Sequence, residues 1–179
     1  MISRIGDGSK RKLAVTVPAA ILLLVLYILI FGFSSQDAEQ SGSLSLWISE
    51  GCVQLLNTLA GGHWSRQFMD GMALYFEHPL RKLAHFGEYA CMGTLLFLIW
   101  SPWLERGKIL YRLIIGWVFV SAALDEFHQW FVPGRYSSFA DVCLDTCGGV
   151  FGLLFCLLLV NLRVRRKNRK NKRKGRSGE

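Results

Sequence analysis

The sequence lacks the usual signatures of a motif-bearing enzyme and of a disulfide-stabilised protein. It contains no phosphate-binding loop, no nucleophile motif, no strong metal-ligand spacing and no internal repeat. Its five cysteines are odd in number and lie mostly inside apolar runs, which excludes an extensive disulfide framework. Acidic residues are also few, 13 against 21 lysines and arginines. These absences weigh against the familiar hydrolase and nucleotide-binding classes.

Long apolar blocks are what the sequence does contain. Because about 20 apolar residues are needed to cross a bilayer, we predict an all-α membrane protein with four transmembrane helices, at about residues 13–33, 82–100, 109–131 and 140–162. Ten of the 21 basic residues lie in the flank at residues 163–179, and four more lie in residues 1–12. Basic flanks mark the cytoplasmic side, so we expect both termini in the cytoplasm and a disordered basic tail.

The first extracytoplasmic loop, residues 34–81, is predicted to carry two short amphipathic helices separated by Gly61-Gly62. Neither is long enough to cross a membrane. They either lie on the outer membrane surface and cap the bundle, or they form a small packed hairpin outside it. Pro79 suits the first turn of the second span.

Polar side chains gather at the predicted outer ends of the second, third and fourth spans. Ionisable residues inside a membrane segment are costly, and they mark functional sites by default. Each helix presents its polar residues as one stripe, so we predict a shared pocket open to the outside. The candidate ligand-binding residues are Lys82, His85, Glu88, Asp125, Glu126, Gln129, Arg135, Asp141 and Asp145.

Individual roles within this pocket stay open at the level of sequence. Arg135 suits a phosphate or carboxylate ligand, or it pairs with Asp141 or Glu126. His85 and Glu88 resemble an acid–base pair or half of a metal site, or they join two helices by hydrogen bonds. No metal site is predicted and no cofactor is assigned. If the pocket is catalytic, the candidates are His85, Glu88, Glu126 and Asp141.

The same residues resemble the VanZ-like family of small bacterial membrane proteins. The resemblance rests on Lys82-x-x-His85-Phe86-x-Glu88-Tyr89, on Asp125-Glu126-x-x-Gln129-x-Phe131-x-Pro133-Gly134-Arg135, on Asp141-Val142 and on the earlier Phe33-Ser34-Ser35-Gln36 with Ser41. It covers roughly residues 31–152. It implies an integral membrane protein whose founding relative is linked to teicoplanin resistance. Serine at 137 and aspartate at 145 replace the glycine and asparagine usual in the family.

Pocket and resemblance together predict a function in the bacterial cytoplasmic membrane. We expect binding of an amphiphilic envelope ligand: a lipid headgroup, a cell-wall precursor or a lipid-tailed glycopeptide such as teicoplanin, with glycopeptide resistance as one consequence. The alternative is a membrane-embedded enzyme that modifies such a molecule by acid–base or metal-assisted chemistry, so the sequence leaves enzymatic activity open. A homo-oligomer is also open, and no nucleic-acid partner is expected because the basic run directly follows an apolar helix.

Overall fold

The computed structural model describes residues 2–176, with side chains over residues 8–169 and Asn171. Met1 and residues 177–179 of the two predicted flanks lie outside this range. The described chain is entirely helical and contains no strand. Its five helices are α1 (Ile2–Ser34), α2 (Ala38–Leu59), α3 (Arg66–Trp100), α4 (Lys108–Gln129) and α5 (Phe139–Arg176).

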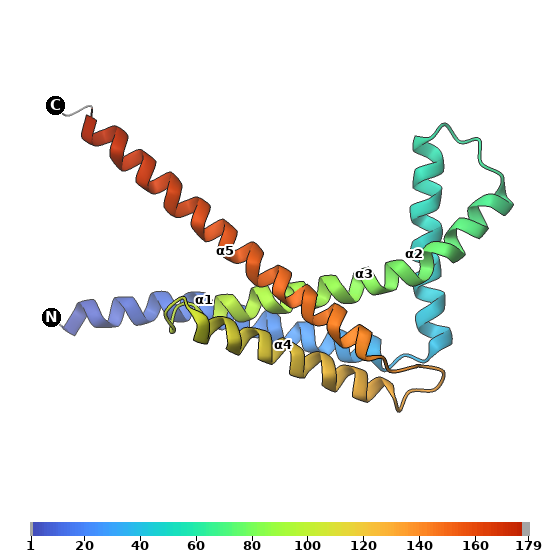
Figure 1. Ribbon diagram of the computed structural model, residues 1–179, viewed down its shortest axis with the longest axis horizontal. Helices are drawn as coiled ribbons and strands as arrows, with labels where there is room; N and C mark the ends of the chain where they lie inside the picture. The colour runs from blue at the N-terminus through green and yellow to red at the C-terminus, as the bar shows by residue number, and fades with distance from the viewer. Residues whose placement is uncertain (1, 177–179) are drawn as a thin grey trace.

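Four of the helices form an elongated bundle. Figure 1 shows α1, α4 and the second half of α3 running along the long axis, with α5 crossing them obliquely. α2 stands crosswise at one end, beside the first half of α3. Both ends of the chain lie toward the opposite end of the bundle. The core is apolar and includes Tyr89, Met92, Leu96, Ile114 and Val118.

Three helical segments are long and apolar enough to cross a membrane: Gly8–Ser34, Arg66–Trp100 and Phe139–Arg169. The prediction of membrane helices is thereby supported for three of the four spans. α4 is 22 residues long, but it does not meet the same criterion within the described chain. Its charged residues explain the difference, because every stretch of 18 residues within α4 contains three of Lys108, Arg112, Asp125 and Glu126.

Two predicted boundaries are wrong. The predicted disordered tail is helical as far as Arg176, as a continuation of α5. The predicted break before the second span is also absent, because α3 begins at Arg66 and runs through Pro79. Proline removes one helical hydrogen bond and usually kinks or ends a helix. Contacts with α2 hold the turns of α3 that precede Pro79: Ser49 Oγ donates to the carbonyl of Ala73 at 2.7 Å, and Ser45 Oγ donates to Glu77.

α2 is a helix of 22 residues, longer than the short amphipathic helix predicted before Gly61-Gly62. Asp37 caps it by accepting a hydrogen bond from the backbone N–H of Gln40 at 2.8 Å. Its buried face is made of small residues, Ser41, Ser45, Ser49 and Val53. The apolar residues Leu55 and Leu59 are instead 61% and 77% exposed. The polar side of α2 therefore packs on α3, and its apolar side faces outward.

Glycines allow α5 to cross α3 at very short range. A Cβ at Gly148 would overlap the carbonyl oxygen of Phe86, and one at Gly152 would overlap that of Ala90. A Cβ at Gly93 of α3 would likewise overlap the carbonyl oxygen of Gly149. Small residues let membrane helices approach closely, and this crossing brings the polar start of α5 against α3.

Candidate functional site

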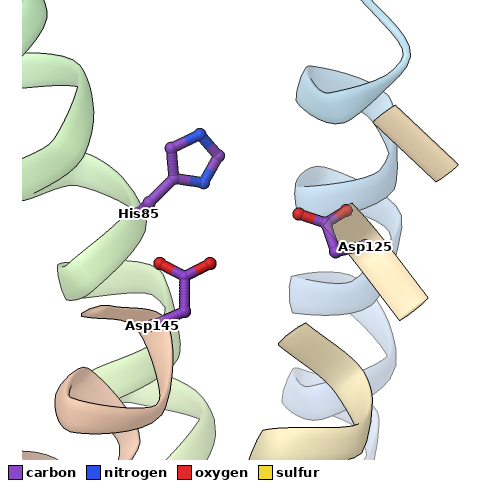
Figure 2. Close-up of side chains that lie close together, drawn as sticks. All are labelled: His85, Asp125 and Asp145. Carbon is purple, nitrogen blue, oxygen red and sulfur yellow. The ribbon is translucent and has the colours of Figure 1, made fainter. Parts of the chain in front are cut away.

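Three helices bring one ionisable side chain each to a common point. His85 comes from α3, Asp125 from α4 and Asp145 from α5. One potential ligand atom of each lies within 4.8 Å of those of the other two. Figure 2 shows His85 and Asp145 next to one another, with the Asp125 carboxylate facing them from the other side. We call these three residues the His85 cluster.

The cluster is buried and incompletely hydrogen-bonded. Asp125 is 6% exposed and Asp145 2% exposed. Among the described residues, Asp125 Oδ1, Asp145 Oδ1, His85 Nδ1 and Glu88 Oε2 are buried without a hydrogen-bond partner. His85 Nδ1 and Glu88 Oε2 are 3.6 Å apart, which is too long for a hydrogen bond. Since most buried polar atoms in proteins are paired, this concentration of unpaired atoms needs a chemical explanation.

Gln129 and Arg135 support the cluster from the α4 side. Gln129 Nε2 donates to Asp125 Oδ2 at 3.2 Å and to Ser34 Oγ at 3.4 Å. Arg135 donates to the backbone carbonyls of Phe33 and Gln36, both at 3.1 Å, and to Gln129 Oε1 at 3.4 Å. Arg135 thus joins the loop after α4 to the end of α1. Each of these three contacts is to a neutral oxygen.

Burial lowers the pKa of Arg135 below its ordinary value, and the nearby positive charge of Arg81 lowers it further. Nearby carboxylates, including Asp125, Glu126 and Asp37, act in the opposite direction. Arginine ordinarily titrates above pH 12, so the guanidinium is expected to stay protonated. A partly desolvated positive charge of this kind favours an anionic ligand.

The remaining predicted residues surround the cluster. Lys82 Nζ donates to Asp141 Oδ1 at 2.6 Å, which joins α3 to the first turn of α5. Glu126 Oε2 accepts a hydrogen bond from the backbone N–H of Ser138 at 2.9 Å. Glu126 therefore anchors the start of α5, whereas its neighbour Asp125 faces the cluster. Neither Asp141 nor Glu126 forms the direct ion pair with Arg135 that the sequence left open.

Two adjoining cavities open around these residues. One, of about 370 Å³, is mainly apolar and is lined by Phe33, Leu44, Ile48, Leu80 and Leu83 among others. The other, of about 190 Å³, is lined mainly by charged and polar residues, and we call it the polar cavity. The polar one is lined by Lys82, Glu126, Gln129, Asp141 and Asp145 among others. Arg81, His85 and Arg135 line both. Glu88 lines the apolar cavity, so eight of the nine predicted ligand-binding residues border a cavity and Asp125 lies behind them in the cluster.

Sequence reasoning missed Arg81 and its partners as site residues. Arg81 forms an ion pair with Glu77, which also accepts a hydrogen bond from Ser45. Glu77 and Arg81 have the i, i+4 spacing of a helical ion pair. That signal was present in the sequence, but it was hidden by the assumption that a new helix starts at Pro79.

Another histidine and two cysteines, whose side chains could carry chemistry, lie outside the cluster. His128 stacks on Phe31 with ring centroids 4.4 Å apart, and its Nε2 lies 3.2 Å from Ser35 Oγ. It therefore lies at the interface between α1 and α4. Cys143 and Cys147 are free and exposed on α5. None of the three belongs to the His85 cluster.

The Lys82–Asp141 ion pair provides a test of the α3–α5 register. Lys82→Glu or Asp141→Lys places two like charges together, so either variant is expected to lower the melting temperature of the purified protein in detergent. The double reversal restores an attractive pair, and the coupling free energy from the four melting curves should be about 1 kcal/mol. Asp70→Lys, at an exposed position in the first turns of α3, serves as the control. Additive single effects would show that the pair does not hold the helices together.

The described chain is an all-helical protein with three segments able to cross a membrane and an ionisable cluster between its helices. These features are consistent with a membrane protein. The sequence model of the VanZ/LLP1 family matches residues 19–160, and the chain therefore belongs to the VanZ/LLP1 family. The resemblance found in the sequence motifs is thus confirmed. No curated protein and no solved structure shows a significant match to the chain.

Proposed function

We propose that this protein binds an amphiphilic molecule of the cell envelope. The observation that carries the proposal is the pair of adjoining cavities, one apolar and one polar, that share Arg81, His85 and Arg135. Ligand sites are commonly concave, mostly apolar and fitted with a few polar groups that fix orientation. An amphiphile matches this division, with its tail in the apolar cavity and its head in the polar one.

The two guanidinium groups where the cavities adjoin favour an anionic head. The three hydrogen bonds of Arg135 are all to neutral oxygens, so none of them neutralises its positive charge. Arg81 has a buried Nε without a partner among the described residues, although its Nη2 contacts Glu77. Guanidinium groups bind phosphates and carboxylates through paired hydrogen bonds. A phospholipid headgroup, a lipid-linked wall precursor and the lipid-tailed glycopeptide teicoplanin all fit this general chemistry, and glycopeptide resistance would follow from capture of the last.

The tail is expected to enter from the membrane beside α2. Leu44 and Ile48 of α2 line the apolar cavity, and both are partly exposed. The rest of the apolar face of α2 points outward, and the helix lies crosswise to the bundle (Figure 1). A helix with an unpaired apolar face suits the boundary between headgroups and acyl chains. In this arrangement α2 would form one wall of a lateral entrance for a lipid.

For the topology we propose four spans, namely the three segments described above and α4, with both termini in the cytoplasm. The two chain ends lie toward the same end of the bundle (Figure 1), as an even number of crossings requires. The basic flanks before residue 13 and after residue 162 favour the cytoplasm for that end. The charged residues of α4 that lower its hydropathy include Asp125 and Glu126, which are buried against the other helices. The two cavities then open at the outer face of the bacterial cytoplasmic membrane.

Photo-crosslinking to a lipid tests the proposal. The full chain is placed in vesicles with photoactivatable phosphatidylglycerol, and crosslinked peptides are identified by mass spectrometry. Ile48→Glu puts a carboxylate into the apolar cavity, so crosslinking at this site is expected to fall about tenfold, since burying that charge costs well over 1.4 kcal/mol. Leu55→Glu, on the exposed side of α2 away from the cavities, should keep normal crosslinking.

Equal crosslinking in Ile48→Glu and the unmodified protein would contradict the proposed tail site. Photoactivatable phosphatidylcholine tests the charge preference, because its zwitterionic headgroup should compete poorly for Arg81 and Arg135. Recovery of a lipid with an altered mass, in addition to its crosslink, would replace simple binding with enzymatic modification as the function.

A further inference from the structure

The His85 cluster has the donor atoms of a metal site. It offers an imidazole nitrogen from α3, a carboxylate from α4 and a carboxylate from α5, and all three ligand atoms lie within 4.8 Å of one another. Two ligands of one Zn²⁺ ion are at most about 4.2 Å apart, given bonds of about 2.1 Å. Small side-chain rotations would therefore be enough to bring the three atoms onto one ion. Figure 2 shows the Asp125 carboxylate directed toward His85 and Asp145.

A second observation points to a missing ligand at this place. The carboxylates of Asp125 and Asp145 are more than nine-tenths buried, and each has one oxygen without a hydrogen-bond partner in the described chain. Glu88 Oε2 and His85 Nδ1 are unpaired in the same way. Burying polar atoms without partners is costly. A cation bound between His85, Asp125 and Asp145 would give the buried carboxylates a partner.

The charge balance also favours a cation. The nearby basic residues Arg81 and Lys82 form ion pairs with acids outside the cluster. Arg81 pairs with Glu77, and Lys82 pairs with Asp141. Among the described residues, no lysine or arginine forms an ion pair with Glu88, Asp125 or Asp145. Charges buried in a protein are normally paired or bound to a metal. One divalent ion among these three carboxylates would offset two of their three negative charges.

The hydrogen bonds that hold Asp125 in place are of the kind that orients a metal ligand. Gln129 Nε2 donates to Asp125 Oδ2, which leaves Oδ1 free to point into the cluster. Gln129 is itself held by Ser34 and Arg135. Such supporting hydrogen bonds orient ligating carboxylates and are a regular part of metal sites.

We propose that His85, Asp125 and Asp145 bind a divalent transition-metal cation, with Glu88 within reach as a fourth ligand. One imidazole nitrogen with carboxylate oxygens suits Zn²⁺ or Mn²⁺, and the absence of a thiolate from the cluster disfavours the softest metals. The site lies where the two cavities meet, because His85 lines both of them and Asp145 lines the polar one. It is independent of the proposed lipid binding, since its ligands are all side chains of this chain.

Metal binding is tested on the full chain in detergent, without added lipid. After treatment with a chelator, the protein is equilibrated with Zn²⁺ or with Mn²⁺, separated from free metal and analysed by mass spectrometry of the elements. About one ion per chain is expected. Asp145→Asn and His85→Ala should each weaken binding about tenfold or more, because removing a ligand costs at least as much as disturbing a supporting residue. Asp70→Asn and His63→Ala are the matched controls, since both residues are exposed and outside the cluster.

A second measurement separates loss of the site from loss of the fold. Zn²⁺ should raise the melting temperature of the unmodified protein, because a ligand that binds only the folded state stabilises it. Zn²⁺ should not raise the melting temperature of Asp145→Asn, even if that variant without metal is as stable as the unmodified protein. The proposal is overturned if the protein holds no stoichiometric metal, or if Zn²⁺ stabilises Asp145→Asn and the unmodified protein equally. Lipid crosslinking at Ile48 would stand or fall separately, because it is measured without metal.

Discussion

Alanine at Gly152 is expected to destabilise the whole bundle. The added methyl carbon would overlap the backbone carbonyl of Ala90 on α3, and a backbone atom cannot rotate out of the way. α5 would have to move off α3, which separates apolar side chains packed on both sides of the crossing. Overpacking of this kind costs about 1–3 kcal/mol. In a protein of this size that corresponds to a fall in melting temperature of roughly 2–12 °C. Thermal unfolding of the purified protein in detergent measures it.

Gly116→Ala is the matched control for this effect. Gly116 also lies inside a helix, α4, but nothing comes within 4 Å of a Cβ built there. Alanine is a better helix former than glycine, so this variant should melt at the same temperature or slightly higher. If Gly152→Ala were as stable as Gly116→Ala, the close crossing of α3 and α5 would be contradicted.

Loss of Arg135 is the second large effect. Its guanidinium joins the carbonyls of Phe33 and Gln36 to the side chain of Gln129, so Arg135→Met removes three contacts that hold the end of α1 to the α4–α5 loop. Leaving acceptors without partners costs about 1–3 kcal/mol each when they are buried. Because two of these contacts are only partly buried and the one to Phe33 is exposed, we expect a total of about 2 kcal/mol. Chemical denaturation in detergent, followed by helical circular dichroism, gives this value.

Arg135→Lys separates geometry from charge. Lysine keeps the positive charge but lacks the planar fork that reaches three oxygens at once. It is therefore expected to recover less than half of the lost stability. Limited proteolysis should cut the loop at residues 130–138 faster in both variants than in the unmodified protein. Full recovery by lysine would show that charge alone matters at this position and would refute the bridging role.

Much of the helical organisation can be predicted from sequence. Apolar runs gave the cores of α1, α4 and α5 and the second half of α3, because side chains in a membrane must be apolar over a fixed length. Gly61 and Gly62 were correctly identified as a break, and both have positive φ angles that suit glycine. Pro79 was misleading, since α3 continues through it, and hydrogen bonds from α2 hold the turns that precede the proline. The amphipathic character of α2 could be predicted from its sequence. Which of its two sides packs against α3 could not.

For the candidate site, the sequence by itself determined which residues sit near the outer ends of the predicted spans. A polar residue in an apolar run stands out by its cost in the membrane, so His85, Asp125 and Asp145 could all be named. Only the tertiary structure decided their grouping. Asp125 and Glu126 are adjacent in the chain, yet Asp125 joins the His85 cluster while Glu126 holds the backbone of Ser138. That division depends on helix rotation and on the close α3–α5 crossing at Gly148 and Gly152, which arise from packing between segments distant in the chain.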